Sequence, residues 1–214
     1  PVLDVPAPGG HAIIGDRAFG ADQGVVAALG RAFCTGLLDG GVLPVLKHIP
    51  GHGRAQADSH LALPVVETGA DALDASAFAP FRALADMPLA MTAHVAYAAL
   101  DGTRPATLSA PILESVLRGR IGFDGVLMSD DLGMKALGGG FAARAEDTLR
   151  AGCDVVLHCS GDMDEMTAVA KGCRALDGVA ARRCADALAR LRPPAAFDAA
   201  DAERRLTALL ALTA

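Results

Sequence analysis

A chain of 214 residues is long enough to bury its own core, as one large domain or as two small ones. Charged residues make up 21% and hydrophobic residues 52% of it, which is typical of a soluble globular protein. The formal net charge of -6 argues against nucleic-acid and anionic-membrane partners, because both bind clustered Lys and Arg. The apolar runs are short, and none approaches the roughly 18 to 20 residues that span a bilayer.

The cysteines bear on the redox environment of the protein. There are five of them, an odd number, and no two have CxxC spacing. This pattern favours free thiols over a disulfide framework or a zinc site. We therefore expect a reducing compartment.

Five short apolar runs rich in Val, Leu or Met predict β-strands. They are residues 2–5, 45–48, 89–94, 126–129 and 155–159. Between the first two, "DQGVVAALGRAFCTGLLDGG" predicts a helix that stops at the glycine pair 40–41. The apolar face of this helix is predicted to contain Val25, Val26, Leu29, Phe33 and Leu37.

Further helices are expected between and after the later strands. The segment "FAPFRALADM" predicts a short helix with Pro80 in its first turn, and Ser109 is expected to cap the next helix. The segment "FAARAEDTLRAG" predicts another, closing at Gly152. From about residue 164 to the end, the chain predicts two or three Ala-rich helices and no strand.

Repeated strand–helix units predict a parallel sheet covered by helices, either an open doubly wound sheet or a (β/α)8 TIM barrel. No GxGxxG follows the first strand, which weighs against a dinucleotide-binding sheet. Polar side chains follow the carboxyl ends of the strands, where a barrel gathers its active site. They are His48, His94, residues 129–131 and His158. We therefore predict a TIM barrel.

Five units make up only part of a barrel, since a complete one takes about 250 residues. We predict that residues 1–214 are the C-terminal portion of a single TIM-barrel catalytic domain and cover about its last five strand–helix units. Residues before Pro1 are expected to supply the first three. His94 and His158 are expected to be structural histidines at strand ends.

The loop "KHIPGHGRAQADSH" holds three of the six histidines. His48, His52, Asp58 and His60 are metal-ligand types, but their spacing matches no compact zinc pattern, and we predict no metal and no cofactor. For His52, capping of backbone groups at the strand end is an equally good interpretation. Asp58 and His60 form a sharper pair, because a carboxylate that orients an imidazole makes a proton donor and acceptor near neutral pH.

The segment "GVLMSDDLGMKA" is an apolar strand that ends in two aspartates, Asp130 and Asp131. Successive side chains diverge at a strand end, so one aspartate points into the top of a barrel. Ser129 or Asp131 could instead cap the following helix, and the two interpretations are compatible. An ionised carboxylate here can attack the anomeric carbon of a sugar.

"KHIPGHG", followed by "DSH" and "SDDLGMKA", resembles the β-N-acetylglucosaminidases of glycoside hydrolase family 3, close to the cytoplasmic peptidoglycan-recycling type. "PVLDV" and "IIGDRAFG" fit the same pattern, and the resemblance implies a cytoplasmic protein. The resemblance implies a TIM barrel and a retaining hydrolase of β-linked N-acetylglucosamine. It implies that Asp130 is the nucleophile and that His60, assisted by Asp58, is the acid/base. It also implies that the loop glycines are hinges. Arg17, Lys47 and His48 would bind the sugar.

Three other functions are compatible with these residues. A histidine base does not repel phosphate, so the enzyme could be a phosphorylase. A metal-dependent hydrolase could be built on His48, His52 and His60. A degenerate barrel could bind sugar without cleaving it. The expected partner in the leading interpretation is a small carbohydrate, and the sequence does not fix the oligomeric state.

Overall fold

The structure is a computed structural model that describes residues 1–212. Its strands are β1 (Val45–Ile49), β2 (Val65–Val66), β3 (Leu89–Thr92), β4 (Ala96–Tyr97), β5 (Val126–Asp131) and β6 (Val155–Leu157). Its α-helices are α1 (Gln23–Asp39), α2 (Ala70–Ala75), α3 (Ala79–Ala83), α4 (Ala98–Asp101), α5 (Phe141–Ala151), α6 (Met163–Gly172), α7 (Gly178–Leu188) and α8 (Ala199–Leu210). The remaining helical turns are η1 (Gly15–Arg17), η2 (Ala106–Leu108) and the π-helical η3 (Ile112–Arg120).

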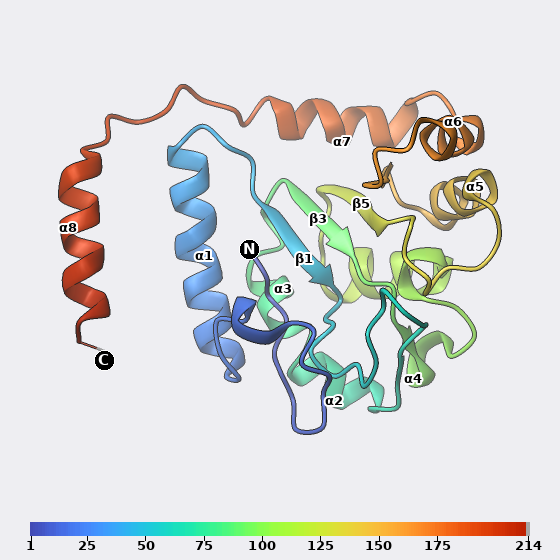
Figure 1. Cartoon of the computed structure of the whole chain (residues 1–214), viewed down its shortest axis with the longest axis horizontal. Helices are drawn as coiled ribbons and strands as arrows, with labels where there is room; N and C mark the ends of the chain where they lie inside the picture. The colour runs from blue at the N-terminus through green and yellow to red at the C-terminus, as the bar shows by residue number, and fades with distance from the viewer. Residues whose placement is uncertain (213–214) are drawn as a thin grey trace.

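Four strands form a parallel sheet in the order β1-β3-β5-β6, and β2 pairs with β4 separately. Each strand lies beside the next one of the sheet along the chain, as in a barrel, and the order never reverses as it does in a doubly wound sheet. Helix α1 lies beside the β1 end of the strand order, and α5 and α6 lie beyond its β5–β6 end (Figure 1). Because the four strands are parallel, their carboxyl ends lie at the same end of the sheet, and this end carries the candidate site.

The first predicted strand, residues 2–5, forms only one parallel bridge, between Val2 and Lys47. Its pairing with β1 consists of the hydrogen bonds from Leu3 N–H to the Lys47 carbonyl and from Lys47 N–H to the Pro1 carbonyl. The ladder stops there because Asp4 turns toward histidines and Pro6 has no N–H to donate. The segment still lies next to β1, in the position that the barrel order requires.

The predicted apolar face of α1 is wrong in part. The helix buries Val26, Gly30 and Cys34, whereas Val25, Leu29 and Phe33 are about half exposed. A Cβ on Gly30 would lie 2.4 Å from Leu3 Cδ2, so the small residue lets the helix approach the core closely. Packing distance, rather than side-chain hydrophobicity, selects the buried face.

The remaining helix predictions are confirmed. Ser109 Oγ accepts a hydrogen bond from Ile112 N–H as a cap does, Pro80 lies in the first turn of α3, and α5 stops at Gly152 with φ of 119°. Three helices, α6 to α8, follow β6, and the described residues after β6 contain no strand. None of the helices in residues 1–212 is long and apolar enough to cross a membrane.

Helix α7 crosses the amino-terminal end of the sheet (Figure 1). Arg183 on α7 contacts Asp124 at 2.6 Å and Asp154 at 3.1 Å, and Arg118 contacts the same buried Asp154 at 2.8 Å. These ion pairs hold α7 at the amino-terminal end of the sheet, opposite the end that carries the candidate site. The assignment of residues 1–214 to one partial barrel stays a prediction.

Candidate active site

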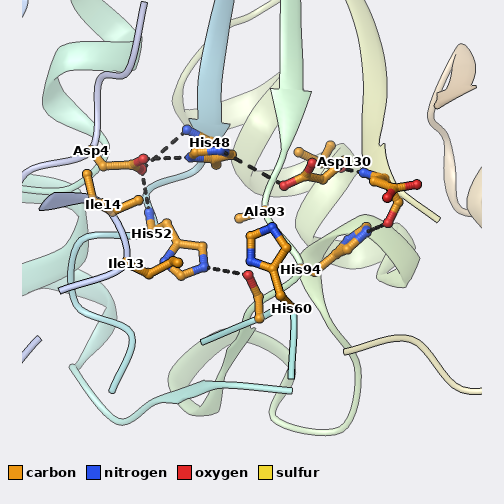
Figure 2. A network of polar contacts seen from close by, with 12 residues as sticks. Asp4, Ile13, Ile14, His48, His52, His60, Ala93, His94 and Asp130 are labelled. Atoms are coloured by element: carbon orange, nitrogen blue, oxygen red, sulfur yellow. Dashed lines mark hydrogen bonds and ion pairs between the residues drawn. The ribbon is translucent and has the colours of Figure 1, made fainter. Parts of the chain in front are cut away.

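The candidate active site is a cavity of about 160 Å³ at the carboxyl ends of the strands. Its lining contains five of the six residues predicted from the sequence, and Asp58 contacts one of them. The lining residues are Ile13, Ile14, Arg17, Lys47, His48, His52, Ser59, His60 and Asp130. Figure 2 shows side chains from separate parts of the chain turned toward this shared space.

Asp130 lies at the end of β5, where the strand brings it into the cavity. Its Oδ1 accepts the Asp131 backbone N–H at 2.8 Å, and its Oδ2 is 4.0 Å from His48 Nε2. One oxygen is thus held by the backbone while the other faces His48 and the cavity. A carboxylate oriented in this way can act on a bound group without first reorganising.

Asp131 points elsewhere and caps a turn. The prediction that Ser129 or Asp131 caps the next helix is wrong, because that helix, α5, begins only at Phe141. Its Oδ1 accepts the backbone N–H groups of Gly133, at 2.9 Å, and of Cys159, at 3.1 Å. Ser129 Oγ accepts the Leu157 N–H at 2.9 Å and so ties β5 to β6. The two aspartate side chains therefore diverge at the strand end, as expected. Asp131 stabilises the turn, and Asp130 faces the cavity.

His60 and Asp58 contact each other in the loop after β1. Asp58 Oδ1 accepts the His60 backbone N–H at 2.8 Å and is also 2.8 Å from His60 Nδ1. The backbone hydrogen bond, followed by the hydrogen bond and charge of the ring, holds the pKa of Asp58 below its usual range. The ionised carboxylate fixes the proton on Nδ1, which leaves Nε2 as the exchanging atom.

Asp4 is a site residue that the sequence analysis missed. It is fully buried, and its Oδ2 is 2.7 Å from His48 Nδ1, while its Oδ1 accepts the backbone N–H groups of His48 at 3.3 Å and His52 at 2.6 Å. Burial raises the pKa of Asp4, but the charge on His48 and these hydrogen bonds outweigh burial and hold it below the usual value. The available signal was an acid inside the apolar run "PVLDV".

Asp4 determines which ring nitrogen of His48 faces the cavity. Because Nδ1 donates to the Asp4 carboxylate, Nε2 is the ring atom that faces Asp130 (Figure 2). Lys47 lines the cavity beside it. Arg17 also lines the cavity, but its guanidinium donates to the carbonyl oxygens of Ile13, at 2.8 Å, and Ile14, at 3.2 Å.

The loop glycines have a packing role. A Cβ on Gly53 would lie 2.1 Å from the Val5 carbonyl oxygen, and one on Gly51 would meet Ala77 at 3.0 Å with the backbone at φ of 134°. Only glycine permits these approaches. The glycines thus let residues 51–53 sit buried against the N-terminal segment.

His94 and His158 are tied to protein groups, as expected of structural histidines. His94 is buried between Thr107 Oγ1, at 2.7 Å, and the Asp131 carbonyl oxygen, at 3.1 Å, and burial lowers its pKa. His158 Nε2 contacts Glu165 at 3.0 Å. Within residues 1–212, no three His, Cys, Asp or Glu side chains are arranged to hold a metal ion.

Comparison with known proteins identifies the family. Residues 1–192 match the family described as the glycosyl hydrolase family 3 N-terminal domain. The chain belongs to glycoside hydrolase family 3. It shares 46% identity over 164 residues with a beta-hexosaminidase of Aromatoleum aromaticum, covering 75% of this chain and 46% of the relative. It thus spans about half the length of the curated relatives it matches.

Solved family 3 structures share the fold. NagZ from Neisseria gonorrhoeae, in complex with N-trifluoroacetyl-D-glucosamine, matches with a TM-score of 0.78 and 38% identity, over 94% of this chain and 57% of that one. A family 3 beta-N-acetylglucosaminidase from Paenibacillus sp. str. FPU-7 matches with a TM-score of 0.81 and 32% identity, over 93% of this chain and 41% of that one. The predicted barrel-type α/β fold is therefore confirmed.

Proposed function

We propose that the native protein is a retaining β-N-acetylhexosaminidase that releases terminal β-linked N-acetylglucosamine. The observation that supports this most strongly is that Asp130 and His60, which are far apart in the sequence, line one cavity with Arg17, Lys47 and His48. Family membership and relatives named beta-hexosaminidase support the same reaction class.

In the proposed reaction, Asp130 Oδ2 attacks the anomeric carbon while the bond to the leaving oxygen breaks. His60 Nε2–H donates its proton to that oxygen, and a covalent glycosyl-enzyme forms. Water then attacks the same carbon, gives its proton to His60 Nε2, and releases Asp130 as a carboxylate. Asp58 holds the ring and balances its charge in both steps.

The sugar would lie between Asp130 and the cationic side of the cavity. Lys47 and Arg17 supply positive charge near the nucleophile, and His48 Nε2 is free of protein hydrogen bonds within the described residues, so it can bind a sugar hydroxyl. The glucosamine derivative named with the Neisseria gonorrhoeae NagZ structure supports an N-acylated glucosamine as the bound sugar.

We further propose that the substrates are peptidoglycan fragments that end in anhydro-muramic acid and that hydrolysis takes place in the bacterial cytoplasm. The motifs "KHIPGHG", "DSH" and "SDDLGMKA", which resemble those of the peptidoglycan-recycling type, support this substrate. All five cysteines are free, and Cys34 and Cys153 are buried, which agrees with a reducing compartment.

Asp130→Ala tests the proposal in the native gene product with an aryl N-acetylglucosaminide as substrate. Turnover should fall by at least about 10³-fold, because no other carboxylate lines the cavity among the described residues. Asp71→Asn, an exposed change on α2, should leave the rate unchanged. Near-normal turnover by Asp130→Ala would exclude Asp130 as nucleophile.

Two further measurements separate the alternatives. Adding inorganic phosphate and looking for sugar 1-phosphate distinguishes a phosphorylase from a hydrolase. Calorimetric binding of N-acetylglucosamine without product after long incubation would indicate a non-catalytic sugar-binding barrel instead.

A further inference from the structure

The loop that carries His60 has a single buried residue. In the acid/base loop, residues 56–62, Ser59 is only 3% exposed, whereas the neighbouring His60 side chain is 60% exposed. A buried serine beside an exposed histidine indicates an attachment point, because buried polar groups are those that have partners.

Ser59 is bound from two directions. Its Oγ is 3.0 Å from Nε2 of His52, which follows β1, and its carbonyl oxygen accepts the Ala136 N–H at 3.2 Å. Next to it, the His60 carbonyl oxygen accepts the Lys135 N–H at 3.3 Å. Lys135 and Ala136 follow Asp130 closely in the chain, so the loop is attached to the same segment that carries the nucleophile.

His52 is a firm anchor for the loop. Its backbone N–H is held by Asp4 Oδ1 at 2.6 Å, and its ring packs edge-on against His48 with centroids 5.8 Å apart. Its Nδ1 is buried and has no hydrogen-bond partner among the described residues, so Ser59 is the polar partner of this ring there. Burial lowers the pKa of His52, which favours the neutral ring, and a neutral ring suits a hydroxyl partner.

These contacts span the sheet. The strands β1 and β5 are separated by β3 in the sheet order, and the acid/base loop joins the segments that follow them. A proton donor must be held within a few tenths of an ångström of its productive position, because a misplacement of about 1 Å costs roughly 10²-fold in rate.

We propose that His52 and Ser59 are positioning residues that hold His60 in register with Asp130 and thereby set the efficiency of proton transfer to the leaving group. This inference rests on the proposed glycosidase function. Neither residue exchanges a proton with substrate, and both act through the loop backbone.

Ser59→Ala and His52→Gln test the inference in the native gene product, with the exposed Gln56→Ala on the same loop as the matched control. The assay compares kcat/KM for an aryl N-acetylglucosaminide with an acidic leaving group and for one with a poor leaving group. Ser59→Ala should lose about 10- to 100-fold on the poor leaving group and less than about 3-fold on the acidic one, because only the former needs protonation.

Hydrogen–deuterium exchange supplies a readout that does not depend on activity. Both variants should exchange faster at the backbone N–H groups of Lys135 and Ala136, which lose their loop acceptors, and Gln56→Ala should not. Unchanged exchange would overturn the attachment. Faster exchange with equal losses on both substrates, or with no loss, would overturn the positioning role.

The two proposals can fail separately. If the wild-type protein cleaves no N-acetylglucosaminide, the proposed function fails and the catalytic part of this inference fails with it. If the wild type is active and Ser59→Ala matches it on both substrates, only the positioning role is refuted.

Discussion

Asp4→Asn changes one buried atom from an acceptor to a donor and leaves the shape of the side chain unchanged. The amide oxygen can keep the two backbone N–H groups of His48 and His52, and the amide nitrogen then faces His48 Nδ1 at the 2.7 Å now occupied by Oδ2. To avoid two opposed donors, the His48 proton must move to Nε2, on the side of Asp130.

The expected loss of stability follows from the hydrogen bonds. Charge-assisted hydrogen bonds contribute about 1.5 to 3 kcal/mol each and neutral ones about 0.5 to 1.5. Weakening three such bonds should cost about 2 to 4 kcal/mol, which lowers Tm by roughly 5 to 15 °C for a chain of this size. Asp4→Ala would leave three buried donors without an acceptor and should prevent folding.

Thermal unfolding followed by circular dichroism measures this loss of stability. The pH dependence of the loss shows whether the negative charge of Asp4 is its cause. Because the folded pKa of Asp4 lies below its usual value of 3.8, the carboxylate stabilises the fold fully above that value. This contribution disappears as the pH falls through the folded pKa. The gap in Tm between wild type and Asp4→Asn should therefore be largest near neutral pH and shrink in acid.

The partly exposed Asp74, which pairs with Arg82 at the surface, provides the matched control. Asp74→Asn should change stability by less than about 1 kcal/mol, because surface ion pairs contribute little. If Asp4→Asn melts with the wild type, or if the gap does not narrow in acid, then Asp4 does not act as a charged anchor and the reasoning is refuted.

Three further predictions concern other parts of the molecule. Burial lowers the pKa of His52 and His94, so as the pH drops below their usual 6.5 these histidines take up protons in the unfolded chain before they do so in the folded one. The free energy of unfolding should therefore fall between pH 7.5 and pH 5.5, which urea unfolding at the two pH values measures. His94→Gln should reduce this fall. Gly53→Ala should lower the free energy of unfolding by about 1 to 3 kcal/mol, because the added Cβ would overlap the Val5 carbonyl oxygen. Gly69→Ala, whose Cβ would point into open space, should leave it unchanged in the same urea denaturation assay. Burial raises the pKa of Cys153 to about 12, so brief alkylation at pH 8 followed by mass spectrometry should label the exposed Cys159 and Cys173 and spare Cys153; its labelling in the folded protein would contradict this packing.

Local patterns predicted most of the secondary structure. Alternating strands and helices gave the parallel barrel-type fold, and caps and stops such as Ser109 and Gly152 gave helix ends, because these signals act within a few residues. The face of α1 was predicted wrongly because hydrophobicity alone does not reveal how closely a helix approaches its neighbour. Gly30 allows that approach only because Leu3 lies opposite it in the fold.

In the candidate site, too, local contacts could be predicted from the sequence, whereas contacts between distant segments could not. Asp58 and His60 are two residues apart, so their contact is local and the sequence alone suggested it. The contacts of Asp4 with His48 and His52 span more than forty residues and could not be inferred from spacing. The same holds for the attachment of the loop at Ser59, which depends on residues after β5.

The sequence by itself determined the types of groups available at the strand ends, since residue identity and strand periodicity are local properties. Only the tertiary structure decided which of them share one cavity, which oxygen of Asp130 faces it, and which histidines are enclosed. Those outcomes depend on burial and on contacts between distant segments, where a buried carboxylate must find its donors wherever the fold brings them.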